Sequence, residues 1–182
     1  MKTTHPVVAV ACVDSPLGPL LLAASERGLN GLWFEDQRHL PPWLAGREPA
    51  PVTHHPVLDT TARQLQAYFA GERDVFDLPL DLEQGTDFQR AVWHALLTIP
   101  VRASMSYGAL ARQIGRPAAV RAVGAAVGRN PLGIIVPCHR VLGADGSLTG
   151  YAGGLWRKTA LLRLEQGHDA HAPVGATHDL FS

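Results

Sequence analysis

The hydrophobic pattern changes its period about halfway along the chain of 182 residues, and this change limits the possible folds more than any other feature. Three short apolar runs, at 7–13, 19–24 and 32–34, are separated by turn-forming residues, a pattern typical of an antiparallel meander. From Thr86 onward the apolar residues recur at helical spacing instead. A chain that builds a small sheet first and helices afterwards is expected to adopt an α+β fold.

This organisation predicts two structural units and a tail. The N-terminal unit, 1–84, would add to the sheet an amphipathic helix over 58–69 and a short edge strand at 75–80. The C-terminal unit, 85–167, would be mainly helical. Residues 168–182 consist largely of His, Ala and Asp with one Gly and one Pro, and we expect a flexible tail there.

Helix start signals recur three times in the C-terminal unit. Thr86 or Asp87 can cap a first helix, Ser106 can cap a second, and Pro117 suits the first position of a third that runs to about Val127. The last two helices, joined by a Gly-Arg-Pro turn, make a candidate helix-turn-helix. The third consists almost entirely of small side chains. It could therefore pack tightly in a core or lie close to another surface, and the pattern alone leaves both possibilities open.

The formal net charge is zero, but the two halves of the chain carry opposite charges. Residues 1–89 contain 6 basic and 12 acidic side chains, whereas residues 90–164 contain 10 basic side chains and a single acid, Asp145. Such asymmetry indicates an anionic partner for the basic half.

Composition excludes several classes of protein. With 46% hydrophobic and 18% charged residues the chain is typical of a globular protein. No apolar run approaches the roughly 20 residues that a membrane span needs, so no membrane association is expected. The two cysteines, Cys12 and Cys138, are too few for a secreted disulfide scaffold, which favours a cytoplasmic location.

The segment around Cys138 carries the candidate chemistry. An apolar strand is predicted at 134–136, after which the chain delivers Cys138 and His139 together. A thiol is a strong nucleophile only as a thiolate, which requires a proton acceptor nearby. His139 could accept that proton if a carboxylate fixed its tautomer, and Glu165 is a candidate for this role. The residues alone leave open a structural Cys-His pair and a thiol hydrolase.

Several motifs occur together and in a characteristic order. They are Phe88-x-x-x-Val92-Trp93, Ser106-Tyr107, Arg121-Ala-Val-Gly124, Asn130-Pro131, Pro137-Cys138-His139-Arg140, Tyr151-Ala-Gly-Gly154 and Leu161-Leu-x-x-Glu165. In these motifs the chain resembles the O6-alkylguanine-DNA alkyltransferases, also called methylated-DNA–protein-cysteine methyltransferases. The resemblance is strong over 88–167 and looser before residue 85, where it rests on Ser15-Pro-Leu-Gly18. It implies a ribonuclease H-like N-terminal unit and a winged-helix-like C-terminal unit.

The resemblance implies a DNA repair protein that moves an alkyl group from guanine O6 to Cys138, once per molecule and with no cofactor. His139 would deprotonate Cys138 through a water molecule, and Glu165 would orient the imidazole. Tyr107 would donate a proton toward the guanine ring, and Asn130 would brace the turn before the cysteine. The family's non-reactive alkyltransferase-like relatives carry tryptophan where this chain has Cys138.

The resemblance also implies how double-stranded DNA would be bound. The target base must leave the stack to reach a buried thiol, and Arg121 would fill the gap that it leaves. The helix carrying Arg121 would lie in the minor groove with no sequence preference, where small side chains and Tyr107 approach the DNA. The small residues are Ala119, Ala122 and Gly124, and the pocket for the flipped base would be formed by Val141, Tyr151, Ala152 and Val127.

Some features are particular to this chain. Gly133 and Val127 are small, so alkyl groups bulkier than methyl could fit the pocket. The N-terminal half offers a zinc ion only Cys12 with His5, His39, His54 and His55, at spacings unlike those of zinc sites, and no metal is expected. A monomer is expected. The alternative function is a damage-recognition protein that binds alkylated bases in the minor groove while Cys138 stays inert.

Overall fold

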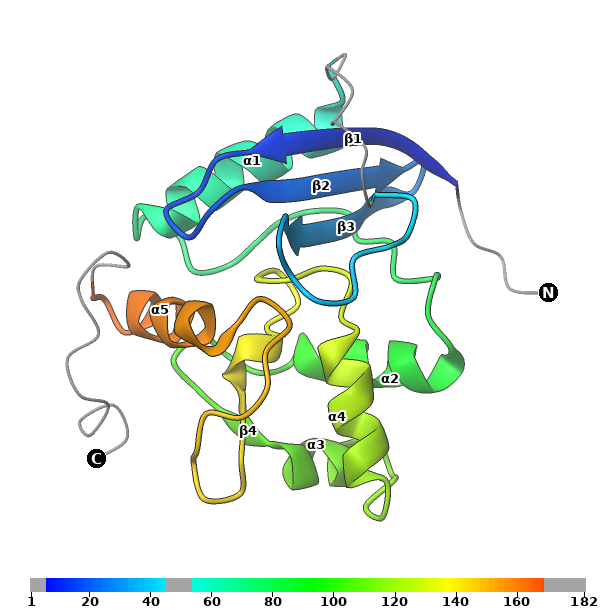
Figure 1. The fold of residues 1–182 in the computed structure, drawn as a ribbon, viewed down its shortest axis with the longest axis vertical. Helices are drawn as coiled ribbons and strands as arrows, with labels where there is room; N and C mark the ends of the chain where they lie inside the picture. The colour runs from blue at the N-terminus through cyan, green and yellow to red at the C-terminus, as the bar shows by residue number, and fades with distance from the viewer. Residues whose placement is uncertain (1–5, 45–53, 169–182) are drawn as a thin grey trace.

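A three-stranded antiparallel sheet and one helix form the N-terminal unit of the computed structural model, which describes residues 6–44 and 54–168. The strands are β1 (Val7–Val13), β2 (Leu20–Ser25) and β3 (Gly28–Phe34), hydrogen-bonded in that order. Helix α1 (Pro56–Phe69) packs against all three strands, with Leu58 and Leu65 buried (Figure 1). The predicted meander and amphipathic helix are therefore confirmed.

Strand β3 begins four residues earlier than the sequence predicts. The turn before it contains only Glu26 and Arg27, because Ser25 already pairs with Gly28. Gly28 has φ +153°, and a Cβ there would lie 2.3 Å from the Pro79 carbonyl oxygen. Glycine therefore allows the backbone of the following segment to approach the strand closely.

The outer edge of β3 is covered by two segments from later in the chain. Leu29 forms an isolated parallel bridge with Leu80, and Leu32 forms another with Leu132. The edge strand predicted at 75–80 is thus reduced to one bridge, because Pro79 has no N–H to donate. The bridge at Leu132 joins the two units through backbone hydrogen bonds.

The C-terminal unit contains four helices and a very short parallel pair of strands. The elements are α2 (Asp87–Leu96), β4 (Met105–Ser106), α3 (Tyr107–Gln113), α4 (Val120–Gly128), β5 (Val141–Leu142) and α5 (Leu155–Glu165). The predicted caps are present. Thr86 forms a reciprocal capping box with Gln89 at the start of α2, and Ser106 Oγ accepts a hydrogen bond from Ala109 N, 3.1 Å away.

One helix boundary and one strand that were predicted in this unit are wrong. Helix α4 begins at Val120 and not at Pro117, because the preceding residues form a turn closed by a 2.9 Å hydrogen bond from Ala119 N to Arg116 O. Residues 134–136 form no strand. Ile134 has φ +69°, and Ile135 N donates to Gly133 O at 2.7 Å, so the apolar run is a buried turn. A short apolar run has no period that would distinguish these alternatives.

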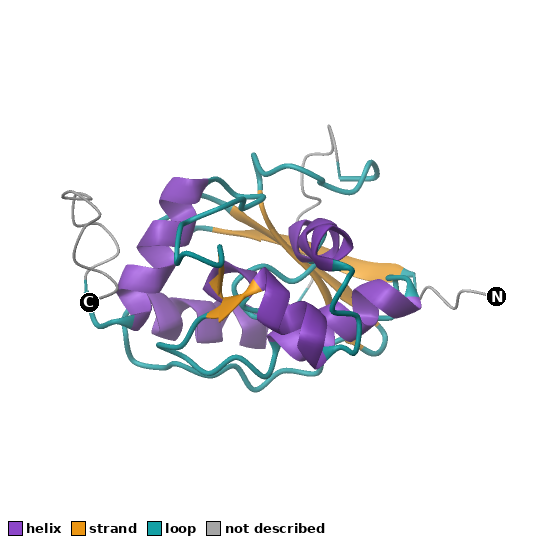
Figure 2. Ribbon diagram, turned by 90° about the horizontal axis from the view of Figure 1, so that it is seen from below, coloured by secondary structure: helices purple, strands orange, loops and turns teal. Residues whose placement is uncertain are grey.

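The larger of two hydrophobic clusters spans both units, and the smaller one lies within the N-terminal unit. The larger cluster includes Leu22 and Leu32 from the sheet together with Leu96, Val136 and Leu161 from the C-terminal unit. Figure 1 shows the sheet and the helices of the C-terminal unit on opposite sides of the molecule, and in Figure 2, which is seen from below, these helices lie in front of the strands. Within the described ranges, none of the helices has the length and apolar character that crossing a membrane requires. His5, and the predicted tail beyond His168, lie outside the described residues.

Candidate active site

Cys138 is held in a single turn of 3-10 helix, Cys138–Arg140, directly after the buried apolar turn. Asn130 braces that turn from one side. Its Nδ2 donates to Val136 O at 2.7 Å, and its Oδ1 accepts from Leu132 N at 3.0 Å. Cys138 N in turn donates to Val136 O at 2.8 Å. The side chain of Asn130 thus ties the backbone on both sides of the turn that positions the thiol.

A cavity of about 150 Å³ opens beside Cys138. Eight residues predicted for the site or its surroundings line it: Tyr107, Gly124, Val127, Asn130, Gly133, Cys138, Tyr151 and Ala152. Val141 is fully buried and does not line the cavity. Three further lining residues were not predicted for this site and come from the loop after β3, namely Gln37, Arg38 and His39.

Glu165 is the centre of a buried polar cluster. Its Oε1 lies 2.7 Å from His139 Nε2 and accepts hydrogen bonds from Arg140 Nη2 at 2.8 Å and Tyr68 Oη at 3.0 Å. Its Oε2 accepts from Arg140 Nε at 2.9 Å. Burial alone would raise the pKa of Glu165, but hydrogen bonds and charges from His139 and Arg140 outweigh it and lower the pKa to about 2. Glu165 is therefore a carboxylate at neutral pH.

The orientation of His139 makes its second nitrogen a base. The carboxylate of Glu165 can only accept, so the imidazole proton lies on Nε2 and the lone pair on Nδ1. Nδ1 is buried and has no hydrogen-bond partner among the described residues. Burial lowers the pKa of His139, although Glu165 opposes this shift, and the ring is neutral at pH 7. A neutral imidazole with a free Nδ1 can accept a proton.

The thiol itself starts protonated. Burial raises the pKa of Cys138, partly offset by a hydrogen bond from Asn130 and by the charge of Lys158. Lys158 is fully buried, and its Nζ donates to the carbonyl oxygens of Val141 at 2.6 Å, Thr149 at 2.9 Å and Gly150 at 3.3 Å. Burial lowers the pKa of Lys158 to about 8, while Cys138 opposes this shift. Lys158 is thus a buried cation close to the Cys138 sulfur.

Tyr107 lines the cavity and is hydrogen-bonded to the loop before α5. Its hydroxyl donates to Thr149 O at 3.1 Å, and its ring lies 3.8 Å from the position that a Cβ on Gly124 would occupy. Burial raises the pKa of Tyr107, so its hydroxyl keeps its proton at neutral pH. The phenol therefore borders the cavity with its proton bonded to Thr149 O.

Helix α4 presents an exposed edge next to the cavity. Arg121 and Ala122 in its first turn are exposed, and Ala119 precedes the helix and is half-buried. Arg121 does not line the cavity. Helices α3 and α4 pack against each other, with the turn between them passing through Gly115 at φ +70°. Arg121 is thus a long basic side chain in the first turn of a helix that otherwise carries only small or short side chains, Val, Ala and Gly.

Two further side chains that contact the site, Tyr68 and Lys158, were not predicted from the sequence. Tyr68 follows Leu65 by three residues on the apolar face of α1, so its hydroxyl was bound to be buried and to need a partner. Lys158 stands between Arg157 and Thr159 in α5, so nothing in the local sequence distinguishes it from an exposed lysine. Arg140 ties the turn that holds Cys138 to the segment that follows α2, since its Nη1 also donates to Ile99 O at 2.6 Å.

No group of three or more His, Cys, Asp or Glu side chains is arranged to hold a metal ion within residues 6–44 and 54–168. Cys12 is exposed, and no disulfide joins it to the buried Cys138.

Comparison with known proteins gives matches along nearly the whole chain. Residues 87–167 match the family model described as 6-O-methylguanine DNA methyltransferase, DNA binding domain, and residues 8–82 match the ribonuclease-like domain of the same family. A methylated-DNA–protein-cysteine methyltransferase of Mycobacterium bovis is 51% identical over 168 residues, covering 91% of this chain and 94% of the relative. One from Methanosarcina barkeri is 47% identical over 161 residues, covering 86% of this chain and 96% of the relative.

A solved structure is similar to the same extent. The crystal structure of the Mycobacterium tuberculosis protein OGT in complex with DNA superposes with a TM-score of 0.77. The two sequences are 51% identical, and the alignment covers 88% of this chain and 94% of the other.

Proposed function

The chain belongs to the family of the methylated-DNA–protein-cysteine methyltransferases, and we propose that it repairs O6-alkylguanine in duplex DNA by transferring the alkyl group to its own Cys138. The observation that carries this proposal is the position of Cys138 beside an open cavity, next to a neutral His139. The free Nδ1 of His139 can accept a proton while Glu165 holds Nε2.

The transfer is a displacement at the alkyl carbon. His139 Nδ1 takes the proton of Cys138 through one water molecule, and the carboxylate of Glu165 stabilises the resulting imidazolium. The thiolate forms a bond to the alkyl carbon as the bond from that carbon to guanine O6 breaks, and the electron pair passes into the guanine ring. Tyr107 supplies a proton to the ring, and the proton lost by Cys138 finally replaces it on Tyr107.

The buried position of the thiol supports base flipping. A guanine stacked in duplex DNA cannot bring O6 to a side chain that is 8% exposed, so the nucleotide must turn out of the helix into the cavity. Helices α3 and α4 would act as a helix-turn-helix placed in the minor groove, and the exposed Arg121 would fill the space in the stack. Ala119, Ala122 and Gly124 would allow close approach.

The reaction occurs once per molecule. The product is a thioether on Cys138, which has no good leaving group and no second nucleophile to release it. The protein would act as a monomer in the cytoplasm, without a cofactor, through the units 1–84 and 85–167. Gly133 and Val127 leave room beside Cys138, so alkyl groups larger than methyl would also be accepted.

Intact mass spectrometry tests the proposal. After incubation with duplex DNA containing O6-methylguanine, the protein should gain the mass of one methyl group, located on Cys138 by peptide mapping. The Cys138→Ser variant, which keeps the fold but has no thiol, should gain nothing. If the wild-type protein binds the lesion but stays unmodified, the alternative of a non-reactive recognition protein replaces this proposal.

A further inference from the structure

The loop that follows β3 forms one wall of the Cys138 cavity. Gln37, Arg38 and His39 belong to the N-terminal unit, yet they line the same cavity as Cys138 and Tyr107. The backbone of this loop is hydrogen-bonded to a lining residue of the C-terminal unit, since Arg38 N donates to Ala152 O at 3.0 Å. The cavity is therefore built from both units.

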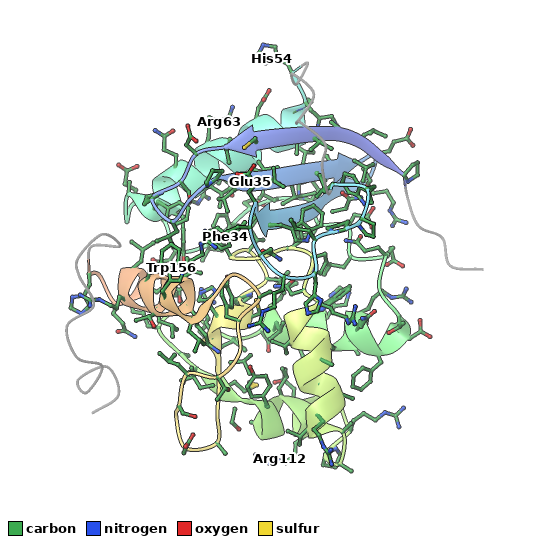
Figure 3. The ribbon with its side chains drawn as sticks, viewed as in Figure 1. Phe34, Glu35, His54, Arg63, Arg112 and Trp156 are labelled. Atoms are coloured by element: carbon green, nitrogen blue, oxygen red, sulfur yellow. The ribbon has the colours of Figure 1, made fainter. Side chains whose placement is uncertain are left out.

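A buried arginine fixes this loop in place. Arg157 of α5 pairs with Asp36 at 2.7 Å and also donates to Gly153 O at 3.0 Å and Leu17 O at 2.8 Å. Its guanidinium lies between two aromatic rings, 4.2 Å from the centre of Phe34 and 4.6 Å from that of Trp156. Figure 3 shows Phe34 and Trp156 at this junction between the sheet and α5.

Arg38 lines the cavity and its side chain is exposed to solvent. Among the described residues that line the cavity, Arg38 alone carries a permanent positive charge. Its side chain is exposed and forms no ion pair with a described residue. The neighbouring Asp36 is paired with Arg157, and Glu35 forms no ion pair with a described residue. Neither acid is therefore engaged with the Arg38 guanidinium.

We propose that Arg38 binds a phosphate group of the nucleotide that enters the Cys138 cavity, so that the N-terminal unit takes part in DNA binding. This inference rests on the proposed function. A flipped nucleotide stays joined to the strand by a phosphate on each side, and these charged groups remain at the mouth while the base enters. A guanidinium offers a fork of N–H donors that matches two phosphate oxygens.

The charge of the surrounding unit makes such a contact important. Residues 1–89 carry 12 acidic and 6 basic side chains, so this half of the molecule repels a DNA strand overall. Arg38 places one positive charge of this half at the point where the strand must come closest. The contact would draw the nucleotide toward Cys138 without reading its base.

The test compares Arg38→Ala with Arg38→Lys and with a matched control, Arg63→Ala. Arg63 is an exposed arginine of α1 that does not line the cavity, so its replacement removes the same charge elsewhere on the N-terminal unit (Figure 3). Three quantities are measured for each variant. They are the second-order rate of methyl transfer from duplex DNA, the rate of transfer from free O6-benzylguanine, and the salt dependence of DNA binding.

Arg38→Ala should lower the duplex rate by about 10-fold, the effect of losing a hydrogen bond to a charged group. It should also reduce the slope of log affinity against log salt by about 1, the contribution of one phosphate contact. Free O6-benzylguanine has no phosphate, and the backbone bond to Ala152 is retained, so any loss on this substrate should be at least fivefold smaller than the loss on duplex DNA. Arg38→Lys should recover part of the duplex rate, and Arg63→Ala should match the wild type.

Equal losses on both substrates would overturn the inference, because Arg38 would then act only on the shape of the cavity. An unchanged duplex rate and salt slope in Arg38→Ala would also overturn it. In either case a wild-type protein that still takes up methyl from duplex DNA keeps the proposed function intact. A wild-type protein that takes up none overturns the proposed function and this inference together.

Discussion

Tyr68 of α1 donates a hydrogen bond to Glu165 at the end of α5, with 3.0 Å between Oη and Oε1. Both side chains are buried, and they are separated by 97 positions in the sequence. Burial and the neighbouring carboxylate raise the pKa of Tyr68 well above its usual value, so the phenol remains a donor. A helix of the N-terminal unit thus holds the carboxylate that orients His139.

Replacing Tyr68 with Phe should slow alkyl transfer several-fold and lower the free energy of unfolding by about 1 to 2 kcal/mol. The ring and its packing remain, but a hydrogen bond to a charged acceptor is lost. Arg140 and His139 still satisfy Glu165, which limits the effect. Urea unfolding and single-turnover rates on O6-benzylguanine measure the two quantities. Wild-type values for both would show that Tyr68 has no influence on Glu165.

Acidification should destabilise the fold in two steps. Burial lowers the pKa of His139 below 6.5, so below that pH the unfolded chain binds a proton that the folded protein excludes. The pKa of Glu165 falls from 4.5 to about 2 on folding, so its contribution to stability is present above pH 4.5 and is lost between pH 4.5 and 2.

Urea midpoints measured from pH 7 to pH 3 should show both steps. Glu165→Gln should remove most of the loss of stability between pH 4.5 and 2. It should also lower the free energy of unfolding at pH 7 by about 3 to 5 kcal/mol, because it leaves Arg140 without its buried partner. The control, Glu83→Gln, breaks only a partly exposed pair with Arg90 and should change stability by about 1 kcal/mol or less. A Glu165→Gln variant with the acid profile of the wild type would contradict the assignment.

Replacing Lys158 with Met should raise the pKa of the Cys138 thiol further. The substitution keeps a long side chain but removes the charge that favours the thiolate. Because Cys12 is exposed and would also react, the comparison is made in a Cys12→Ser background. The pH dependence of thiol alkylation by a small reagent should shift to higher pH in the variant. An unshifted profile would mean that Lys158 acts only through the carbonyl groups that it binds.

Arg121→Ala should slow methyl transfer from duplex DNA by about 10-fold to 100-fold, which corresponds to a few kcal/mol of unstacking that is no longer compensated. Arg121 does not line the cavity, so transfer from free O6-benzylguanine should change less than about twofold. A lesion placed in single-stranded DNA, where no stack must be opened, should restore most of the lost rate. Equal losses on duplex and single-stranded DNA would exclude a role in base flipping.

The helix caps and β1 were predicted correctly because each depends only on residues close by in the sequence. The caps at Thr86 and Ser106 act within three residues, and β1 is recognisable from its own β-branched residues. The predicted strand at 134–136 was wrong because a short apolar run in a buried segment has no period, and its turn is fixed by the side chain of Asn130. The apolar residues of a segment therefore mispredict its backbone conformation when a side chain outside that segment, here Asn130, fixes the conformation.

The parts of the site that the sequence did not predict depend on distant partners. Cys138, His139 and Glu165 were found because they form part of a motif with a fixed order. Tyr68 and Arg38 reach the site only through tertiary contacts, one to Glu165 and the other, through its backbone, to Ala152. The apolar face of α1 indicates that Tyr68 is buried, but no pattern within the first 84 residues identifies Glu165 or Ala152 as a partner.

The pairing of β3 with residues 131–133 also determines when the protein can finish folding during its synthesis. Leu32 N donates to Pro131 O at 2.8 Å, and Leu32 O accepts from Gly133 N at 3.0 Å. Until the ribosome has made these residues, the outer edge of the sheet keeps an unpaired donor and acceptor and can associate with other strands. The N-terminal unit therefore cannot complete its sheet on its own, and the nascent chain must extend almost to the reactive cysteine before that edge closes.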